Sequence, residues 1–220
     1  MNKKYLCLFL VLAIMLVSAC APAQQAPPNP VPEAKPFAPV GISNEKSMQG
    51  ISPDVKDLLD KPKTKVKNIY YKYRGPETGT NFFEFYVKGT KIKYLPAREI
   101  KAFDKPESYN AIYLDVTAKT AQTYCDDRTC LYKGKKGDLN YGNAYIQTMF
   151  DWLNGITSAN KVGEEVIDDR SVWKVETNKG IFWIDAFYGI PLKIKSSTSE
   201  FRFEQIAANS VQDSDVNPSS

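Results

Sequence analysis

The chain has 220 residues with 29 basic and 25 acidic side chains and no histidine, and its formal net charge is +4. Two of the basic residues, Lys3 and Lys4, lie in a segment that we expect to be removed, which leaves +2 and gives no indication of a nucleic-acid partner. Without histidine the chain has no Ser–His or Cys–His catalytic pair and no imidazole metal ligand, so we expect neither an enzyme nor a cofactor.

The first residues are typical of an exported lipoprotein. An apolar run over residues 5–17 follows two lysines, and the segment Val17–Cys20 resembles the lipobox, in which small residues precede a lipidated cysteine. The run is shorter than the ~20 residues with which a helix crosses a bilayer. We therefore predict a signal peptide over residues 1–19 and lipid on Cys20; the alternative is an ordinary cleaved signal with an unrelated cysteine.

Lipid on Cys20 would hold the chain at the outer side of the cell membrane, or at the outer membrane of a cell with two membranes. One acyl chain binds a membrane only weakly, so stable anchoring needs several chains. Seven prolines follow within residues 21–44, with almost no charge. We predict an extended linker over residues 20–50, because such a composition cannot bury a core.

A domain of ordinary size then extends over residues 51–206. It opens with a short predicted helix over residues 52–60, in which Ser52 is the cap and Pro53 occupies the first turn. The last residues, 207–220, are small and polar, and we expect them to be disordered.

After the helix the pattern changes to short runs of aromatic and β-branched residues separated by turn residues, which predicts strands. The first set covers residues 66–74, 82–88, 91–95, 111–116, 120–125 and 130–133. An amphipathic helix over residues 143–156 interrupts them. The second set covers residues 162–167, 171–177, 181–186, 190–195 and 200–206.

The short connections between successive strands predict an antiparallel meander, since parallel strands need long crossovers. A sheet of about eleven strands must curl strongly or close. We therefore predict a mainly β fold: a strongly curved antiparallel sheet, or half-barrel, with a few helices over its concave face. Alternation places Phe83, Phe85 and Val87 on one face of their strand.

Two cysteines, Cys125 and Cys130, remain when Cys7 and Cys20 are set aside. In an exported protein such a pair is most simply a disulfide. The intervening residues 126–129 suit a four-residue hairpin loop with the two cysteines opposite each other at its base. A redox-active pair more typically has two intervening residues, and zinc would need four ligands, so we predict a structural disulfide.

The segments Val172–Val175, Phe182–Asp185 and Tyr188–Ile194 resemble the C-terminal strands of the LolA/LolB-like lipoprotein-carrier superfamily, which includes RseB-type sensors. Members of that superfamily often have a strand that ends in an aromatic residue and an aspartate, then a glycine turn, then a Pro-Leu-Lys strand. The predicted opening helix and the segment Val66–Tyr71 are similar to their first helix and strand. The resemblance implies a half-barrel whose apolar cavity, closed by helices, carries or senses lipid chains or lipidated partners.

The chain departs from this pattern in two respects. Soluble carriers have no lipid anchor, whereas Cys20 makes the chain more similar to an anchored receptor or sensor. The pair Cys125 and Cys130 has no counterpart in the pattern, and no residue role of the family can be transferred by position.

We therefore predict a membrane-anchored extracytoplasmic lipoprotein that binds lipid acyl chains or a lipidated protein. A sensor or protein-interaction module with a filled core is the alternative, and a carboxylate hydrolase is a remote one, because each adjacent carboxylate pair lies in or beside a turn. The inward apolar residues are the candidate ligand contacts: Phe83, Phe85, Val87, Trp173, Phe182 and Ile184.

Overall fold

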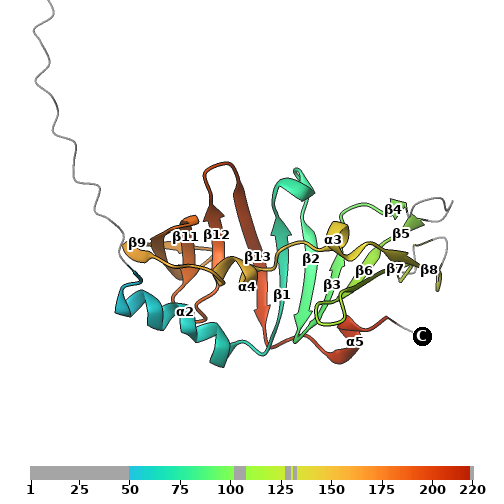
Figure 1. Ribbon diagram of the computed structural model, residues 1–220, viewed down its shortest axis with the longest axis horizontal. Helices are drawn as coiled ribbons and strands as arrows, with labels where there is room; N and C mark the ends of the chain where they lie inside the picture. Colours follow the sequence, from blue (N-terminus) through green and yellow to red (C-terminus); the bar gives the residue numbers. More distant parts are fainter. Residues whose placement is uncertain (1–49, 102–107, 127–129, 131–132, 219–220) are drawn as a thin grey trace, which may run out of the picture. The chain divides into compact units, whose positions relative to one another are not determined.

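The computed structural model describes residues 50–101, 108–126, 130 and 133–218 (Figure 1). Residues 46–220 form one compact unit with its own hydrophobic core. The predicted signal peptide, Cys20 and the linker up to residue 49 lie outside the described residues, so these remain predictions.

The unit begins with helix α2, Pro53–Lys65, which is longer than the predicted helix. The prediction ended at residue 60, short of Pro62, which as a proline offers no N–H to the preceding turn. Instead Pro62 is buried inside the helix, and the last turn carries Lys63 and Lys65, which favour the negative end of the helix dipole. Burial of Val55 and Leu58 against the sheet holds the helix in place.

In the described residues, eleven strands form one antiparallel sheet, and within each of two meanders every strand neighbours the next strand of that sheet along the chain. The first meander consists of β1 (Asn68–Arg74), β2 (Phe83–Lys88), β3 (Lys91–Leu95), β6 (Ala111–Asp115), β7 (Thr120–Tyr124) and β8 (Lys136–Leu139). The second consists of β9 (Ala159–Ile167), β10 (Arg170–Thr177), β11 (Gly180–Asp185), β12 (Pro191–Lys195) and β13 (Glu200–Ala208). Pairing of β1 with β13 joins the two meanders in the middle of the sheet.

The edge strands β8 and β9 do not pair, so the sheet is an unclosed half-barrel, as predicted. Residues 140–158, the crossing segment, connect these two edges and run across one face of the sheet (Figure 1). The same face carries the main core, to which α2 and the crossing segment both contribute. This face is the concave interior of the half-barrel.

The prediction of a single helix over residues 143–156 is wrong. The crossing segment contains two short helices, α3 (Tyr141–Ala144) and α4 (Met149–Leu153), joined by extended chain. Asn140 caps α3, and Thr148 begins α4 by forming a capping box with Asp151. Eleven strands about 4.8 Å apart make a sheet roughly 50 Å wide. The predicted helix over residues 143–156 would span only about 20 Å. The connection between the two edges of the sheet must therefore be partly extended.

The first meander also differs from its prediction around the disulfide. Cys125 and Cys130 are bonded, with their Cα atoms 5.6 Å apart. The partner of β7 is β8, Lys136–Leu139, and the predicted strand over residues 130–133 lies partly outside the described residues. The disulfide therefore links Cys125, directly after β7, to Cys130, which precedes β8 in the chain.

Two short elements that the sequence did not predict complete this half. A 3-10 helix, η1 (Pro76–Thr78), joins β1 to β2. A two-stranded sheet of β4 (Ile100–Lys101) and β5 (Ser108–Tyr109) lies between β3 and β6 in the chain.

The C-terminal residues are structured as far as Pro218, which differs from the prediction of disorder after residue 206. Strand β13 continues to Ala208, and helix α5 (Asp213–Val216) follows. Val211 and Val216 are buried, and Lys88 of β2 forms an ion pair of 2.9 Å with Asp213. Burial of these two valines holds the C-terminal segment against the sheet, although most of its residues are small and polar.

In the described part of the chain, no helix has the length and apolar character needed to cross a membrane. The same residues contain no group of three or more carboxylate or cysteine side chains placed to hold a metal ion.

Candidate functional site

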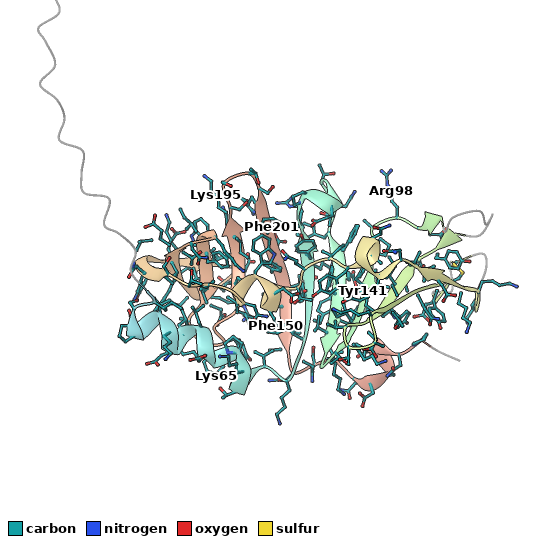
Figure 2. The ribbon with its side chains drawn as sticks, in the orientation of Figure 1. Lys65, Arg98, Tyr141, Phe150, Lys195 and Phe201 are labelled. Carbon is teal, nitrogen blue, oxygen red and sulfur yellow. A yellow bond between two sulfur atoms is a disulfide. The ribbon has the colours of Figure 1, made fainter. Side chains whose placement is uncertain are left out.

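One end of the half-barrel contains an apolar groove with a volume of about 300 Å³. It lies where the end of α2, the start of β1, the β2–β3 turn and α4 meet, and we call it the end groove. Its apolar lining consists of Leu59, Pro62, Val66, Val87, Phe150 and Leu153. In Figure 2, Phe150 lies between α4 and the end of α2 that carries Lys65.

The local structure of α4 explains why this end remains open. Met149 is fully buried at the centre of the core, while Phe150 and Leu153 are only half-buried and face the end groove. The start of α4 is fixed, because Asp151 accepts hydrogen bonds from the backbone N–H of Thr148 at 2.7 Å and from the Tyr145 hydroxyl at 2.7 Å. The helix therefore presents two apolar side chains at a defined position.

The rim of the end groove is cationic. Lys63 and Lys67 line it and are exposed, and Lys63 forms an ion pair of 2.5 Å with Asp60. This lysine holds the pKa of Asp60 below its ordinary value, chiefly through the hydrogen bond. Lys179 binds the carbonyl oxygens of Trp152 and Asn154 at the end of α4. The groove thus combines an apolar floor with positive charge at its edge.

The centre of the concave face is filled instead of open. Phe85, Phe182 and Ile184 each have 0% of their surface exposed. Phe85 stacks on Tyr71 and on Tyr94, with ring centroids 5.2 Å and 5.1 Å apart. These three predicted ligand residues therefore lie beneath the crossing segment, in the packed core.

The other three predicted ligand residues have different surroundings. Phe83 is half-buried and stacks on Tyr94, with centroids 6.0 Å apart. Trp173 is half-buried, and the Lys161 Nζ atom lies 3.7 Å from its ring centroid. Val87 is the one of the six that lines the end groove.

The sequence did not identify the remaining groove residues as candidates. Leu59, Phe150 and Leu153 were visible only as members of apolar helical stripes. A stripe predicts which side of a helix is apolar, but it does not show whether a second element covers that side. The missing information was that α4 is short and ends at Leu153.

The crossing segment contacts the sheet with incomplete hydrogen bonding. Within the described residues, the Tyr141 hydroxyl and the Trp152 Nε1 group are buried and have no hydrogen-bond partner. Each such group costs about 1–3 kcal/mol. By contrast, the Tyr94 hydroxyl donates to the Ala144 carbonyl at 2.8 Å. The Tyr71 hydroxyl of β1 is likewise buried without a partner, so unsatisfied groups occur on both sides of this contact.

A second hollow, on the other face of the sheet, has a volume of about 410 Å³, and Leu95 and Pro96 form part of its lining. Lys93, Asn110 and Asp126 contribute to its lining. Asp126 accepts from the Lys93 ammonium group at 2.8 Å and from the Tyr113 hydroxyl at 2.5 Å. Its charged groups therefore bind one another, and the end groove is the better ligand site.

No family model matches the chain, and no curated protein sequence matches it. Similar solved structures include a LolA superfamily protein from Nitrosomonas europaea, with 10% identity over 74% of this chain and 97% of that chain and a TM-score of 0.28. A DUF1329 family protein from Desulfovibrio piger has 9% identity over 76% and 98%, with a TM-score of 0.27. The half-barrel assignment follows from the strand order and the position of the core, because likeness at these TM-scores is too low to carry it.

Proposed function

We propose that the protein binds an acyl chain of a lipid or of a lipidated protein in the end groove, while lipid on Cys20 tethers it to the outer side of a membrane. The observation that supports this proposal is an open apolar space, about 300 Å³ in volume, at one end of an otherwise filled interior. A methylene group takes up roughly as much room as a water molecule, ~30 Å³, so the groove accommodates on the order of ten methylenes.

The energetics favour reversible binding. Each buried methylene contributes about 0.8 kcal/mol, so ten contribute roughly 8 kcal/mol before the cost of association. That corresponds to dissociation constants no tighter than about 1 μM. Lys63 and Lys67 at the rim suit a carboxylate or phosphate head group. Binding and release would then be passive, with transfer to any acceptor that buries the chain more completely.

Native mass spectrometry of residues 46–220 with dodecanoate and with an acylated peptide tests this proposal. The variant Leu153→Glu places a charge in the end groove, and we expect it to lose the adducts. Val166→Glu is the matched control, because Val166 is 73% exposed on the edge strand β9. Thermal melting of both variants verifies that they are folded. Equal adducts in the two variants would exclude the end groove as the binding site.

The second candidate is a sensor or protein-interaction module in which the interior serves only as core. The complete burial of Phe85, Phe182 and Ile184 favours it. A protein that takes up neither dodecanoate nor the acylated peptide at any concentration tested would support this candidate.

A further inference from the structure

The turn between β11 and β12 displays an exposed aromatic side chain. Phe187 is 62% exposed and is the one exposed aromatic residue in the described part of the chain. It lies in the segment from Asp185 to Pro191, where the sequence has its aspartate and glycine turn. Neither the core nor the end groove uses Phe187.

This turn is held rigidly, so the exposure of Phe187 does not result from a loose loop. Asp185 is 3% exposed, and its Oδ1 atom accepts from the backbone N–H groups of Phe187 at 2.8 Å and Tyr188 at 2.7 Å. Arg170 donates to the Oδ2 atom at 3.1 Å. Gly189 has φ +73°, and a Cβ there would lie 2.2 Å from the Leu58 carbonyl oxygen. Only glycine therefore allows α2 to pack this closely on the turn.

Two lysines of α2 attach to the same turn. Lys61 donates to the Ala186 carbonyl at 2.7 Å, and Lys65 donates to the Phe187 carbonyl at 2.9 Å. The Lys65 Nζ atom also lies 3.8 Å from the centroid of the Phe187 ring. The exposed ring thus stands within a cationic surface that the fold positions by specific bonds.

The charge of α2 is unevenly distributed along the helix. Its first half carries Asp54, Lys56 and Asp57, whereas lysines occupy positions 61, 63 and 65 in its second half, with another at position 67. Asp60 neutralises Lys63 in part through its ion pair. The end of the helix beside Phe187 therefore has a net positive charge.

We propose that the face formed by Lys61, Lys65 and Phe187, the docking face, binds the surface of a membrane that contains anionic phospholipids. Lysines gain from the negative surface potential of such a membrane, and an exposed aromatic ring enters the head-group region. A protein partner would more typically meet a contiguous apolar patch than one ring surrounded by ammonium groups. Because Lys63 and Lys67 of the same stretch line the end groove, docking brings the groove to the bilayer.

Co-sedimentation of residues 46–220 with vesicles tests the docking face. We expect binding to vesicles of phosphatidylcholine with phosphatidylglycerol, little binding to phosphatidylcholine alone, and weaker binding as the salt concentration rises. Phe187→Ser should lower the partition coefficient about tenfold or more. Lys61→Gln with Lys65→Gln keeps a hydrogen-bond donor at both positions and should lower it about 30-fold.

The matched control removes two charges elsewhere. Lys135→Gln with Lys136→Gln changes the net charge equally, at the edge of the sheet opposite to β9 (Figure 1). We expect a change of less than twofold. An equal loss in this control would reduce the effect to nonspecific charge attraction and overturn the proposal, as would a wild-type protein that does not bind anionic vesicles. Thermal melting shows whether each variant is folded.

The proposals for the docking face and for the end groove can be refuted independently. Phe187 does not line the groove, so Phe187→Ser should retain the dodecanoate adduct while it loses vesicle binding. A protein that binds vesicles through Phe187 but takes up no acyl ligand would refute the proposed function alone.

Discussion

The centre and the end of the concave face are built from the same kinds of residue but differ in what covers them. At the centre, Phe85 and Phe182 are fully buried beneath the crossing segment, and Met149 fills the space above the sheet. At the end, Phe150 and Leu153 of α4 are half-buried and line an open groove. The two regions differ because α4 is short, and it directs Met149 to the centre and its neighbours to the groove.

This difference shows that apolar alternation along a strand identifies an inward face but not a binding site. A strand pattern predicts which side chains leave water. Whether a ligand can reach them depends on a segment distant in sequence, here residues 140–158, which covers the middle of the sheet.

Removing a ring from the centre should have the largest effect on stability. Phe182→Ala deletes a side chain that is 0% exposed, and we expect the free energy of unfolding to fall by about 3–5 kcal/mol. Urea denaturation of residues 46–220 measures it. The exposed-site control Val166→Ala should change it by less than about 0.5 kcal/mol. A loss below 1 kcal/mol for Phe182→Ala would mean that the centre is hollow and that the contrast with the end groove is absent.

The second largest effect on the free energy of unfolding should come from alkaline pH. Burial raises the pKa values of Tyr71 and Tyr94 above the ordinary value of 10.0, so the folded state keeps protons that the unfolded chain loses. The stabilisation is complete below pH 10 and is lost as the pH rises toward the folded-state pKa values. The free energy of unfolding should fall by up to about 1.4 kcal/mol per pH unit for each such tyrosine.

Urea denaturation at a series of pH values above 10, with Tyr94→Phe as comparison, measures this decline. The variant loses the hydroxyl bond to Ala144 but also one titrating group, so its stability should fall less steeply. An unchanged slope in Tyr94→Phe would show that Tyr94 ionises as readily in the folded protein as in the unfolded chain.

The second meander was predictable from sequence because its turns are short and local. The predicted strand over residues 171–177 differs from β10 by one residue at its start, and the one over residues 181–186 differs from β11 by one residue at each end. Asp168 and Asp169 have positive φ in the turn before β10, and Gly180 has positive φ at the start of β11. Such turn chemistry fixes both strand ends within a few residues of chain.

The first meander and the crossing segment were less predictable because distant contacts decide them. Strand β8, with sequence Lys-Gly-Asp-Leu, has no strong strand pattern, and pairing with β7 makes it a strand. The crossing segment must join the two edges of the sheet, and that requirement is invisible in a local helical pattern. The fold class and the concave face were therefore predicted, whereas the end groove was not.

The smallest change in stability is expected for a substitution in the end groove, which should instead weaken the binding of dodecanoate. Leu153→Ala removes a half-buried side chain that borders open space, so we expect a loss of only about 1 kcal/mol in the free energy of unfolding. The shortened side chain also removes part of the groove's apolar wall, and dodecanoate should bind about five- to tenfold more weakly in a titration. Phe182→Ala, if it remains folded, should bind dodecanoate as the wild type does, because its ring does not reach the groove. The opposite ranking, with weaker binding in Phe182→Ala and normal binding in Leu153→Ala, would place the ligand at the centre of the half-barrel and require the crossing segment to move aside.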